Sequence, residues 1–233
     1  MSLAIDARHC GAVYVMRCNG RVVAGEELGA METSINRGLR ECRRFVIDMG
    51  EVSRVDSTGL GLLVRFLSHL RSRGGDLRLA APQPFLSDLL RATKLTTIFR
   101  SYDSEEQAVL SFLKEPYVSD REAAIAGPLV LFVDRSVDLG AFVRSLLHSH
   151  GYEVLTTCRT RDAKLLLTAT KFDYLVLGPE CSQTGSDTAV GELKSAAQAM
   201  HIVQLATDFK YDDPEPAATE LLRMLQASRA AKA

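Results

Sequence analysis

The fold of the first half of the chain is decided by one stretch of sequence, Phe45-Val-Ile-Asp-Met-Gly-Glu-Val-Ser-Arg-Val-Asp56-Ser57-Thr58-Gly59-Leu60-Gly61-Leu62-Leu63-Val64. It opens on an apolar run typical of a buried strand, which we predict over Arg44–Met49. A helix is predicted over residues 57–73, because apolar residues recur at i, i+3, i+4 and i+7 from Leu60 onward and Gly74-Gly75 supplies a stop. A strand therefore passes through a short turn into a helix.

The start of this helix is the candidate site. A serine hydroxyl there lies near backbone N–H groups that have no partner within the helix and near the positive end of the helix dipole, a setting that tolerates negative charge. A phosphate on Ser57 would add about −1.5 to −2 charges beside Asp56. Asp and Ser are also preferred helix N-caps, so a plain capping role for Asp56 or Ser57 stays open at this point.

The rest of the first half predicts a mixed sheet covered by helices. Asn19-Gly20 is a strong hairpin signal, flanked by predicted strands at Ala12–Cys18 and Arg21–Ala24. Further strands are predicted at Asp76–Ala80 and Ile98–Tyr102. Helices are predicted at Glu26–Glu41, Phe85–Thr93 and Ser104–Phe112.

Three features together resemble the STAS domain of bacterial anti-sigma factor antagonists, over about residues 10–113. They are Asn19-Gly20-Arg21-Val22, the strand Phe45–Met49 and, above all, Asp56-Ser57-Thr58-Gly59-Leu60-Gly61 between a strand and a helix. The resemblance implies that Ser57 is phosphorylated by a GHKL-type partner kinase, which is itself the anti-sigma factor, and that a serine phosphatase acts in the same pathway. It also implies a partner-binding surface made by Asp56, Ser57, Thr58, Gly59, Leu60 and Gly61.

One segment departs from the pattern of that family. Many members carry an acidic residue at the end of the second strand, where this chain has Val22-Val23-Ala24-Gly25. We therefore expect the surface next to Ser57 to be less acidic, which leaves the identity of the partner open.

The second half of the chain begins after a polar, small-residue segment, which divides the chain into a first domain over residues 1–114, a linker over 115–127 and a second domain over 128–233. A repeated strand–helix pattern follows and predicts a parallel sheet. Its predicted strands are Leu129–Val133, Glu153–Thr157, Tyr174–Leu177 and Ile202–Leu205. Its predicted helices are Val137–Ser149, Arg161–Ala169, Ala189–Ala197 and Ala217–Ser228.

This half is similar to response-regulator receiver domains, through Val130-Leu-Phe-Val-Asp134-Arg135, Gly151-Tyr-Glu-Val-Leu and Phe172-Asp-Tyr-Leu-Val-Leu-Gly178. Phosphoryl acceptance needs a carboxylate at the end of the third strand and an acidic pair for magnesium. Here the third strand ends in Gly178, the acidic pair is reduced to Asp134-Arg135, and Ala206 stands where a hydroxyl residue is usual. We therefore expect a degenerate receiver, a flavodoxin-like sheet truncated before its fifth strand.

The truncation would leave the fourth strand, Ile202–Leu205, at an edge of the sheet. We predict that a helix, the first half of the chain or a second copy covers that strand. The domain would serve for homodimerisation or docking.

Composition excludes several classes of function. The 233 residues, 46% of them hydrophobic, suffice for two domains. Residues 1–114 carry 16 Lys and Arg against 13 Asp and Glu (+3), and residues 115–233 carry 12 against 16 (−4), so neither half has the charge of a nucleic-acid module. No apolar run has the length of a membrane span and Met1–Asp6 lacks the features of a signal peptide, so we expect a cytoplasmic protein without membrane insertion.

The residues that could do chemistry are few. The five cysteines are scattered and suggest free, mostly buried thiols, so we expect no disulfide, metal or cofactor. The G-x-S-x-G element of many serine hydrolases is absent, which argues against catalysis by Ser57. The leading hypothesis is a non-enzymatic regulator that is released from its partner when Ser57 is phosphorylated. The alternatives are a STAS scaffold that binds a small ligand or other signalling proteins without a phosphorylation switch, and an enzyme that uses Ser57 directly.

Overall fold

The computed structural model describes residues 2–114, 127–181, 187–197, 200–209, 211 and 213–230. The chain folds into two compact units, Met1–Val118 and Ser119–Ala233, and each unit is described by itself. Within the predicted linker, residues 115–126 lie outside the described part of the chain.

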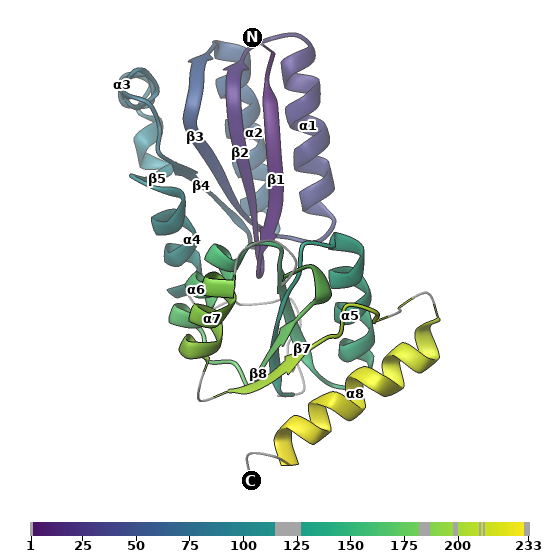
Figure 1. Ribbon diagram of the computed structural model, residues 1–233. Coiled ribbons are helices and arrows are strands. Elements are labelled where there is room, and N and C mark those ends of the chain that lie inside the picture. Colours follow the sequence, from purple (N-terminus) through teal and green to yellow (C-terminus); the bar gives the residue numbers. More distant parts are fainter. Residues whose placement is uncertain are drawn as a thin grey trace. The chain divides into compact units, whose positions relative to one another are not determined.

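Five strands form the sheet in the described part of the N-terminal unit, in the spatial order β5-β4-β3-β2-β1 (Figure 1). They are β1 (Ala4–Cys10), β2 (Val13–Val22), β3 (Arg44–Val55), β4 (Asp76–Ala80) and β5 (Arg100–Tyr102). β1 runs antiparallel to β2, whereas the pairs β2–β3, β3–β4 and β4–β5 are parallel. The predicted mixed sheet is confirmed. β3 continues beyond the predicted end at Met49 to Val55, so the strand delivers the chain directly to Asp56.

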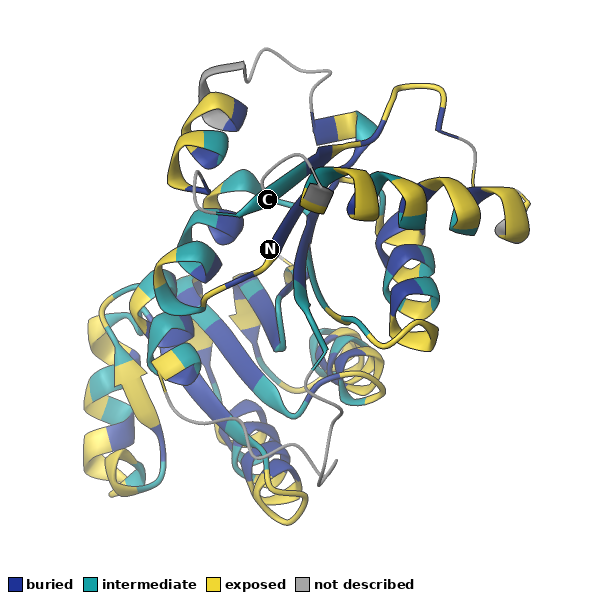
Figure 2. Cartoon of the chain, turned by 90° about the horizontal axis from the view of Figure 1, so that it is seen from below, coloured by how far each residue is buried: buried dark blue, intermediate teal, exposed yellow. Residues whose placement is uncertain are grey.

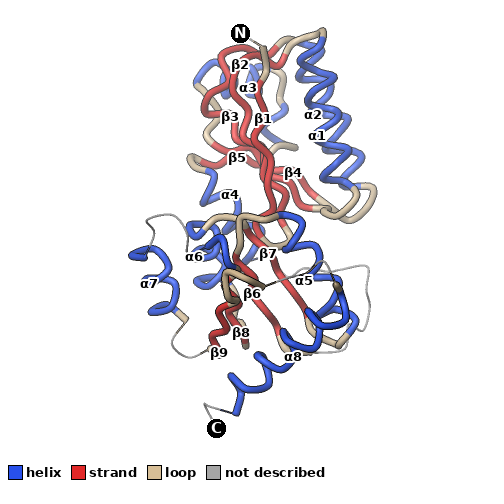
Figure 3. The backbone as a smooth tube through the Cα atoms, turned by 45° about the vertical axis from the view of Figure 1, so that its right-hand side comes forward, coloured by secondary structure: helices blue, strands red, loops and turns tan. Residues whose placement is uncertain are grey.

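Helices cover both faces of this sheet (Figure 3). They are α1 (Glu26–Leu39), α2 (Ser57–Arg71), α3 (Pro84–Ala92) and α4 (Glu105–Lys114), with a 3-10 turn at Leu95–Thr97. Phe45 and Ile47 of β3 point into a core shared with α1 and α2, in which Leu63 and Leu67 of α2 are fully or almost fully buried. Side chains alternate across a strand, so Val46 and Asp48 face the opposite side, where α4 packs.

The face under α4 holds a network of ion pairs. Glu105 at the start of α4 lies 2.5 Å from the guanidinium of Arg8 on β1, and these side chains are only 8% and 4% exposed. Arg17 on β2 bridges this pair to β3, with its nitrogens 3.3 Å from Glu105 and 3.3 Å from Asp48. The buried Arg8–Glu105 pair and the partly exposed Arg17 thus join α4 to the first three strands.

The predicted hairpin at Asn19-Gly20 is wrong. β2 runs through both residues, and the hairpin instead joins β1 to β2 at Gly11-Ala12, where Gly11 has a φ of 58°. Gly20 adopts a φ of 116° inside the strand at an irregularity of the β2–β3 register, and a Cβ there would lie 2.5 Å from the carbonyl oxygen of Ser2. The glycine therefore serves a close approach of the chain rather than a turn.

In the described part of the C-terminal unit the sheet is parallel throughout, with the order β7-β6-β8-β9. Its strands are β6 (Leu129–Val133), β7 (Glu153–Thr157), β8 (Tyr174–Leu177) and β9 (His201–Gln204). The helices are α5 (Val137–Ser149), α6 (Thr160–Ala169), α7 (Asp187–Ala196) and α8 (Pro214–Ala230), and a 3-10 turn spans Pro179–Cys181. The order of elements follows the predicted pattern.

Helices lie on both faces of this sheet (Figures 1 and 3). α5 and α8 share one core with the sheet, while α6 and α7 contact each other on the opposite face. The inner strands β2, β4, β6 and β8 are largely buried, whereas the short strand β5 is mostly exposed, as are the outer faces of the helices (Figure 2).

β9 stands at one end of the strand order in this unit, as predicted. Of the three covers that we predicted for it, helix α8 packs against one face of the strand, while cover of its outer edge stays a prediction. Leu221 and Leu225 of α8 are buried in the same core as Val203 of β9, and the Nδ1 atom of His201 lies 2.9 Å from the carbonyl oxygen of Ser228. One face of the terminal strand is therefore shielded by a helix.

Candidate functional site

Asp56, not Ser57, is the N-cap of α2. Its Oδ1 atom accepts a hydrogen bond from the backbone N–H of Gly59 at 2.8 Å, which is the geometry of a capping carboxylate. Its Oδ2 atom accepts a second bond, at 2.9 Å, from the N–H of Ala24 in the loop between β2 and α1. The backbone N–H of Asp56 in turn donates to the carbonyl oxygen of Val22 at 3.2 Å. One residue thus ties the start of α2 to the end of β2.

These hydrogen bonds keep Asp56 ionised. The N–H groups of Ala24 and Gly59, followed by that of Thr58 and by the charge of Arg54, lower the pKa of the Asp56 carboxyl group, and its partial burial opposes them only in part. The N–H of Gly59, expected to be free beside Ser57, is therefore taken by Asp56. A phosphate on Ser57 would therefore lie beside the carboxylate of Asp56 and would not find a free N–H at Gly59.

The two glycines that follow Ser57 have different environments. A Cβ at Gly59 would lie 2.2 Å from the carbonyl oxygen of Val22, so the close contact between α2 and β2 requires a glycine. A Cβ at Gly61 would meet no atom within 4 Å. Nothing within the described chain therefore requires a glycine at position 61.

The six residues predicted to bind a partner do not all reach the surface. Ser57 and Thr58 are exposed, whereas Asp56 and Gly61 are half-buried. Gly59 and Leu60 are buried against the sheet and the core. The accessible surface is therefore formed by the exposed and half-buried residues, whereas the two buried residues hold it in position.

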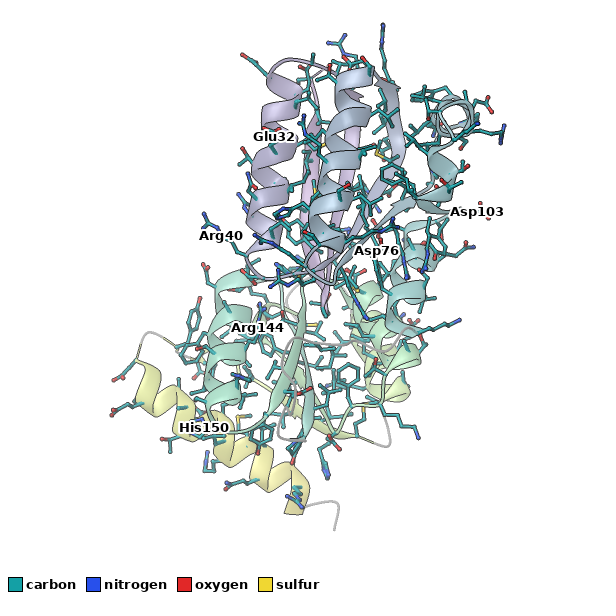
Figure 4. The ribbon with its side chains drawn as sticks, turned by 180° about the vertical axis from the view of Figure 1, so that it is seen from behind. Glu32, Arg40, Asp76, Asp103, Arg144 and His150 are labelled. Carbon is teal, nitrogen blue, oxygen red and sulfur yellow. The ribbon has the colours of Figure 1, made fainter. Side chains whose placement is uncertain are left out.

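The surroundings of this surface carry charges of both signs. Arg21 at the end of β2 lies 3.4 Å from Glu27 in the first turn of α1, and the exposed Arg54 precedes the cap. Farther along the two helices, Glu32 of α1 (Figure 4) lies 3.7 Å from Arg65 of α2. Glu26 and Glu27 follow the segment where we expected a less acidic surface, so acidic groups do begin the helix directly after the loop that Asp56 contacts.

Residues 4–108 match the sequence model of the STAS domain. The N-terminal half of the chain is a STAS domain. Within this half, an anti-sigma F factor antagonist of Paenibacillus polymyxa is 26% identical to the chain over 112 residues, which make up 47% of this chain and 94% of that protein.

Solved structures of anti-sigma factor antagonists are similar to the STAS domain. One, from Mycobacterium paratuberculosis, is 21% identical, with a TM-score of 0.43 over 47% of this chain and 93% of that one. Another is the Bacillus cell fate determinant SpoIIAA in its phosphorylated form, 18% identical, with a TM-score of 0.40 over 47% of this chain and 99% of that one.

Outside the STAS domain, the residues of the predicted degenerate receiver site lie at the carboxyl edge of the second sheet. Asp134 is buried directly after β6, and its two carboxylate oxygens accept the backbone N–H groups of Ser136 at 2.8 Å and Glu180 at 2.9 Å. A Cβ at Gly178 would lie 2.2 Å from Oδ2 of Asp134. The carboxylate of Asp134 therefore fills the space that a side chain at the end of β8 would need.

Arg135 and Ala206 are both exposed, after β6 and β9 respectively. In the described ranges there is no group of three or more His, Cys, Asp or Glu side chains that could hold a metal ion. All five cysteines are free, four of them buried and Cys158 partly exposed. Among the helices of the described residues, none combines the length and apolar character needed to cross a membrane.

Sequence reasoning missed the residues that hold the STAS site in place. Val22 and Ala24 contact Asp56 through backbone atoms, so their side chains carry no signal of this role. The one usable signal was Gly59, since a glycine in the first turn of a helix costs stability unless a close contact requires it.

Proposed function

We propose that the STAS domain is the switch of a partner-switching regulator of the anti-sigma factor antagonist type. With Ser57 unphosphorylated, the surface at the start of α2 binds a GHKL-type serine kinase that acts as an anti-sigma factor. Phosphorylation of Ser57 by that kinase releases the complex, and a serine phosphatase restores binding. The observation that carries the proposal is the exposed Ser57 directly after a fixed, ionised Asp56.

The electrostatics of the site explain why a phosphate would end binding. Phosphorylation adds about −1.5 to −2 charges. Both oxygens of Asp56 already accept backbone N–H groups, so this carboxylate stays in place as a neighbouring negative charge. An interface that covers Ser57 and Asp56 would then bury two anions, which is costly unless each is matched by a cation.

Access to the hydroxyl group is open. Ser57 and Thr58 are exposed, and the space beside Gly61 is empty, so the backbone of a kinase or phosphatase loop could approach the first turn of α2. Among the described residues, Ser57 Oγ makes no hydrogen bond to a histidine or another base. This geometry favours modification of Ser57 over its use as a nucleophile.

The relatives support the same assignment. The Paenibacillus polymyxa relative is named an anti-sigma F factor antagonist, and SpoIIAA has been solved in an unphosphorylated and a phosphorylated form. We carry the phosphorylation over to Ser57 of this chain and place the pathway in the cytoplasm. The C-terminal unit, with a glycine at the end of β8, would act as a docking or dimerisation platform of the pseudo-receiver type.

The test is binding by full-length protein with a changed charge at one position. Wild type, Ser57→Ala, Ser57→Asp and the control Thr58→Asp would be used to capture partners from the source cell, followed by mass spectrometry of phosphosites after incubation of the captured kinase with ATP. We expect wild type and Ser57→Ala to retain a GHKL-type kinase, Ser57→Asp to lose it, and phosphate to appear on Ser57.

Thr58→Asp places the same charge one residue later on the exposed surface. If it releases the kinase as fully as Ser57→Asp, added charge anywhere on this binding surface ends binding, and the phosphosite spectrometry alone then distinguishes Ser57. Equal capture by all variants, with Ser57 unmodified, would contradict the switch and favour a STAS scaffold without phosphorylation.

A further inference from the structure

A cavity lies at the carboxyl ends of three strands in the C-terminal unit. It has a volume of about 380 Å³, and its polar lining comes from Asp134, Arg135, Cys158, Arg159, Thr160 and Cys181. These residues follow β6, β7 and β8. The nonpolar wall is formed by Val133 at the end of β6.

The position of this cavity is the one where open parallel sheets bind ligands. β6 lies between β7 and β8, so the chain moves to one side of β6 after α5 and to the other side after α6. The strand order reverses at β6, and the crevice at the carboxyl ends of the strands beside such a reversal is the usual ligand site of these folds. The cavity opens there.

The charges of the lining favour an anion. Arg135 is exposed and Arg159 half-buried, and both contribute to the wall. Asp134 is the acidic residue of this lining, and its two oxygens are held by the N–H groups of Ser136 and Glu180. A carboxylate fixed in this way has little freedom to turn toward a cation, whereas two guanidinium groups present several N–H donors in planar forks that suit phosphate oxygens.

The pKa of Cys181 reflects the charges around the cavity. Burial raises the pKa of its thiol group, and Asp134 raises it further, whereas Arg135 and Lys194 act in the opposite direction. Arg135 is therefore within electrostatic reach of the buried side of the cavity. Thr160, the first residue of α6, adds a hydroxyl group to the wall, and the preceding Arg159 makes no side-chain hydrogen bond that caps this helix.

The size of the cavity points to more than a bare ion. Sites for small organic molecules commonly have volumes of about 300–1,000 Å³. We propose that this cavity binds a small phosphate ester, with its phosphate group between Arg135 and Arg159 and its organic part against Cys158, Cys181 and Val133. The degenerate receiver site thus binds a phosphorylated molecule without forming a covalent bond.

The test uses the full-length protein labelled with 15N and followed by NMR. The probes are ribose 5-phosphate and AMP as esters, inorganic phosphate and sulfate as bare anions at matched ionic strength, and Mg²⁺ as a cation. We expect saturable shifts of the amide signals of Arg135, Cys158, Arg159 and Thr160 with at least one ester. Inorganic phosphate should bind more weakly, by about tenfold or more.

Charge-removing variants decide whether the two arginines are responsible. Arg135→Gln and Arg159→Gln should each weaken ester binding about tenfold or more, since each removes charge-assisted hydrogen bonds. The control is Arg223→Gln on the exposed face of α8, which removes the same charge from the same unit and should leave binding unchanged.

Three results would overturn the proposal. The first is the absence of saturable shifts with either ester up to about 10 mM, which is weaker than functional binding of a small molecule. The second is equal weakening by all three arginine variants, which would reveal only a diffuse charge effect. The third is a stronger response of these amides to Mg²⁺ or to bare anions than to the esters.

Discussion

Gly59 of α2 lies directly against Val22 of β2, since a Cβ at position 59 would lie 2.2 Å from the carbonyl oxygen of Val22. This approach places the start of α2 beside the loop that follows β2. It brings Ala24 within hydrogen-bond distance of Asp56 and so sets the position of Ser57. The geometry of the proposed switch therefore depends on the absence of a side chain at residue 59.

Gly59→Ala should destabilise the STAS domain by about 1–3 kcal/mol, because a methyl group forced against a backbone carbonyl group must displace the helix or the strand. The measurement is urea unfolding followed by NMR signals of the N-terminal unit, which separates it from the second unit. An unchanged midpoint would mean that α2 can shift at no cost.

Gly61→Ala is the matched change at a position with open space. It should stabilise α2 by about 0.5–1 kcal/mol, because alanine favours helix and meets no atom there. If a kinase loop approaches the bare backbone at this position, the same variant should bind the kinase more weakly although it is more stable. Gain of stability with full binding would place the interface elsewhere.

Asp56→Asn should remove a pH-dependent part of the stability. The folded-state pKa of Asp56 is lowered, so its contribution is fully present above the unfolded value of about 4 and is lost as pH falls through the folded value. The stability difference between wild type and Asp56→Asn should thus be largest near neutral pH and shrink in acid. A difference that is constant with pH would show that the ionised carboxylate is not responsible.

Gly178→Ala should destabilise the C-terminal unit by about 1–3 kcal/mol, because its methyl group would collide with the buried carboxylate of Asp134. Gly178→Asp, which places a carboxylate at the end of β8, should not create a phosphorylation site, since the same space is occupied. The measurements are unfolding of this unit and incubation of the aspartate variant with acetyl phosphate and Mg²⁺. Covalent phosphate on residue 178 would contradict this account.

Glu105→Ala should destabilise the N-terminal unit by about 3–5 kcal/mol, because it leaves the buried Arg8 guanidinium without the carboxylate at 2.5 Å. The control is Asp88→Ala, which breaks an ion pair with Arg91 whose side chains are 71% and 72% exposed and should change stability by about 0–1 kcal/mol. Equal changes in the free energy of unfolding for the two variants would show that burial of the Arg8–Glu105 pair does not increase its contribution to stability.

Local signals were enough to place the elements of the second unit. β6, α5, β7 and β8 begin and end at the predicted residues, because short apolar runs alternate with an amphipathic helix that Ser136 caps and that ends before Gly151. The parallel direction of the unit's strands followed from this alternation of strands and helices.

Contacts between residues that are far apart in the chain could not be predicted from the sequence. Asn19-Gly20 has the composition of a hairpin turn, but the close passage of Ser2 uses the conformational freedom of Gly20 inside β2. Strand β1 was missed for a local reason, since its turn at Gly11-Ala12 lacks the usual Asn-Gly or Asp-Gly pair. The sequence narrowed the cap of α2 to Asp56 or Ser57, and the structure shows that it is Asp56. The second bond of Asp56, from the N–H of Ala24, spans 32 residues and had no signal in the sequence.

The two hydrogen bonds that hold the carboxylate of Asp56 have a consequence for how partner binding responds to salt. Ala24 and Gly59 hold this residue before any partner arrives, so the loop does not need to order on binding. Under the proposed function, the added charge is then a main difference between the two states of Ser57. Mobile ions screen such a difference over about 8 Å at physiological ionic strength. The affinity ratio between the two states should therefore narrow as salt rises, which would make the osmotic and ionic condition of the cell a second input to the same switch.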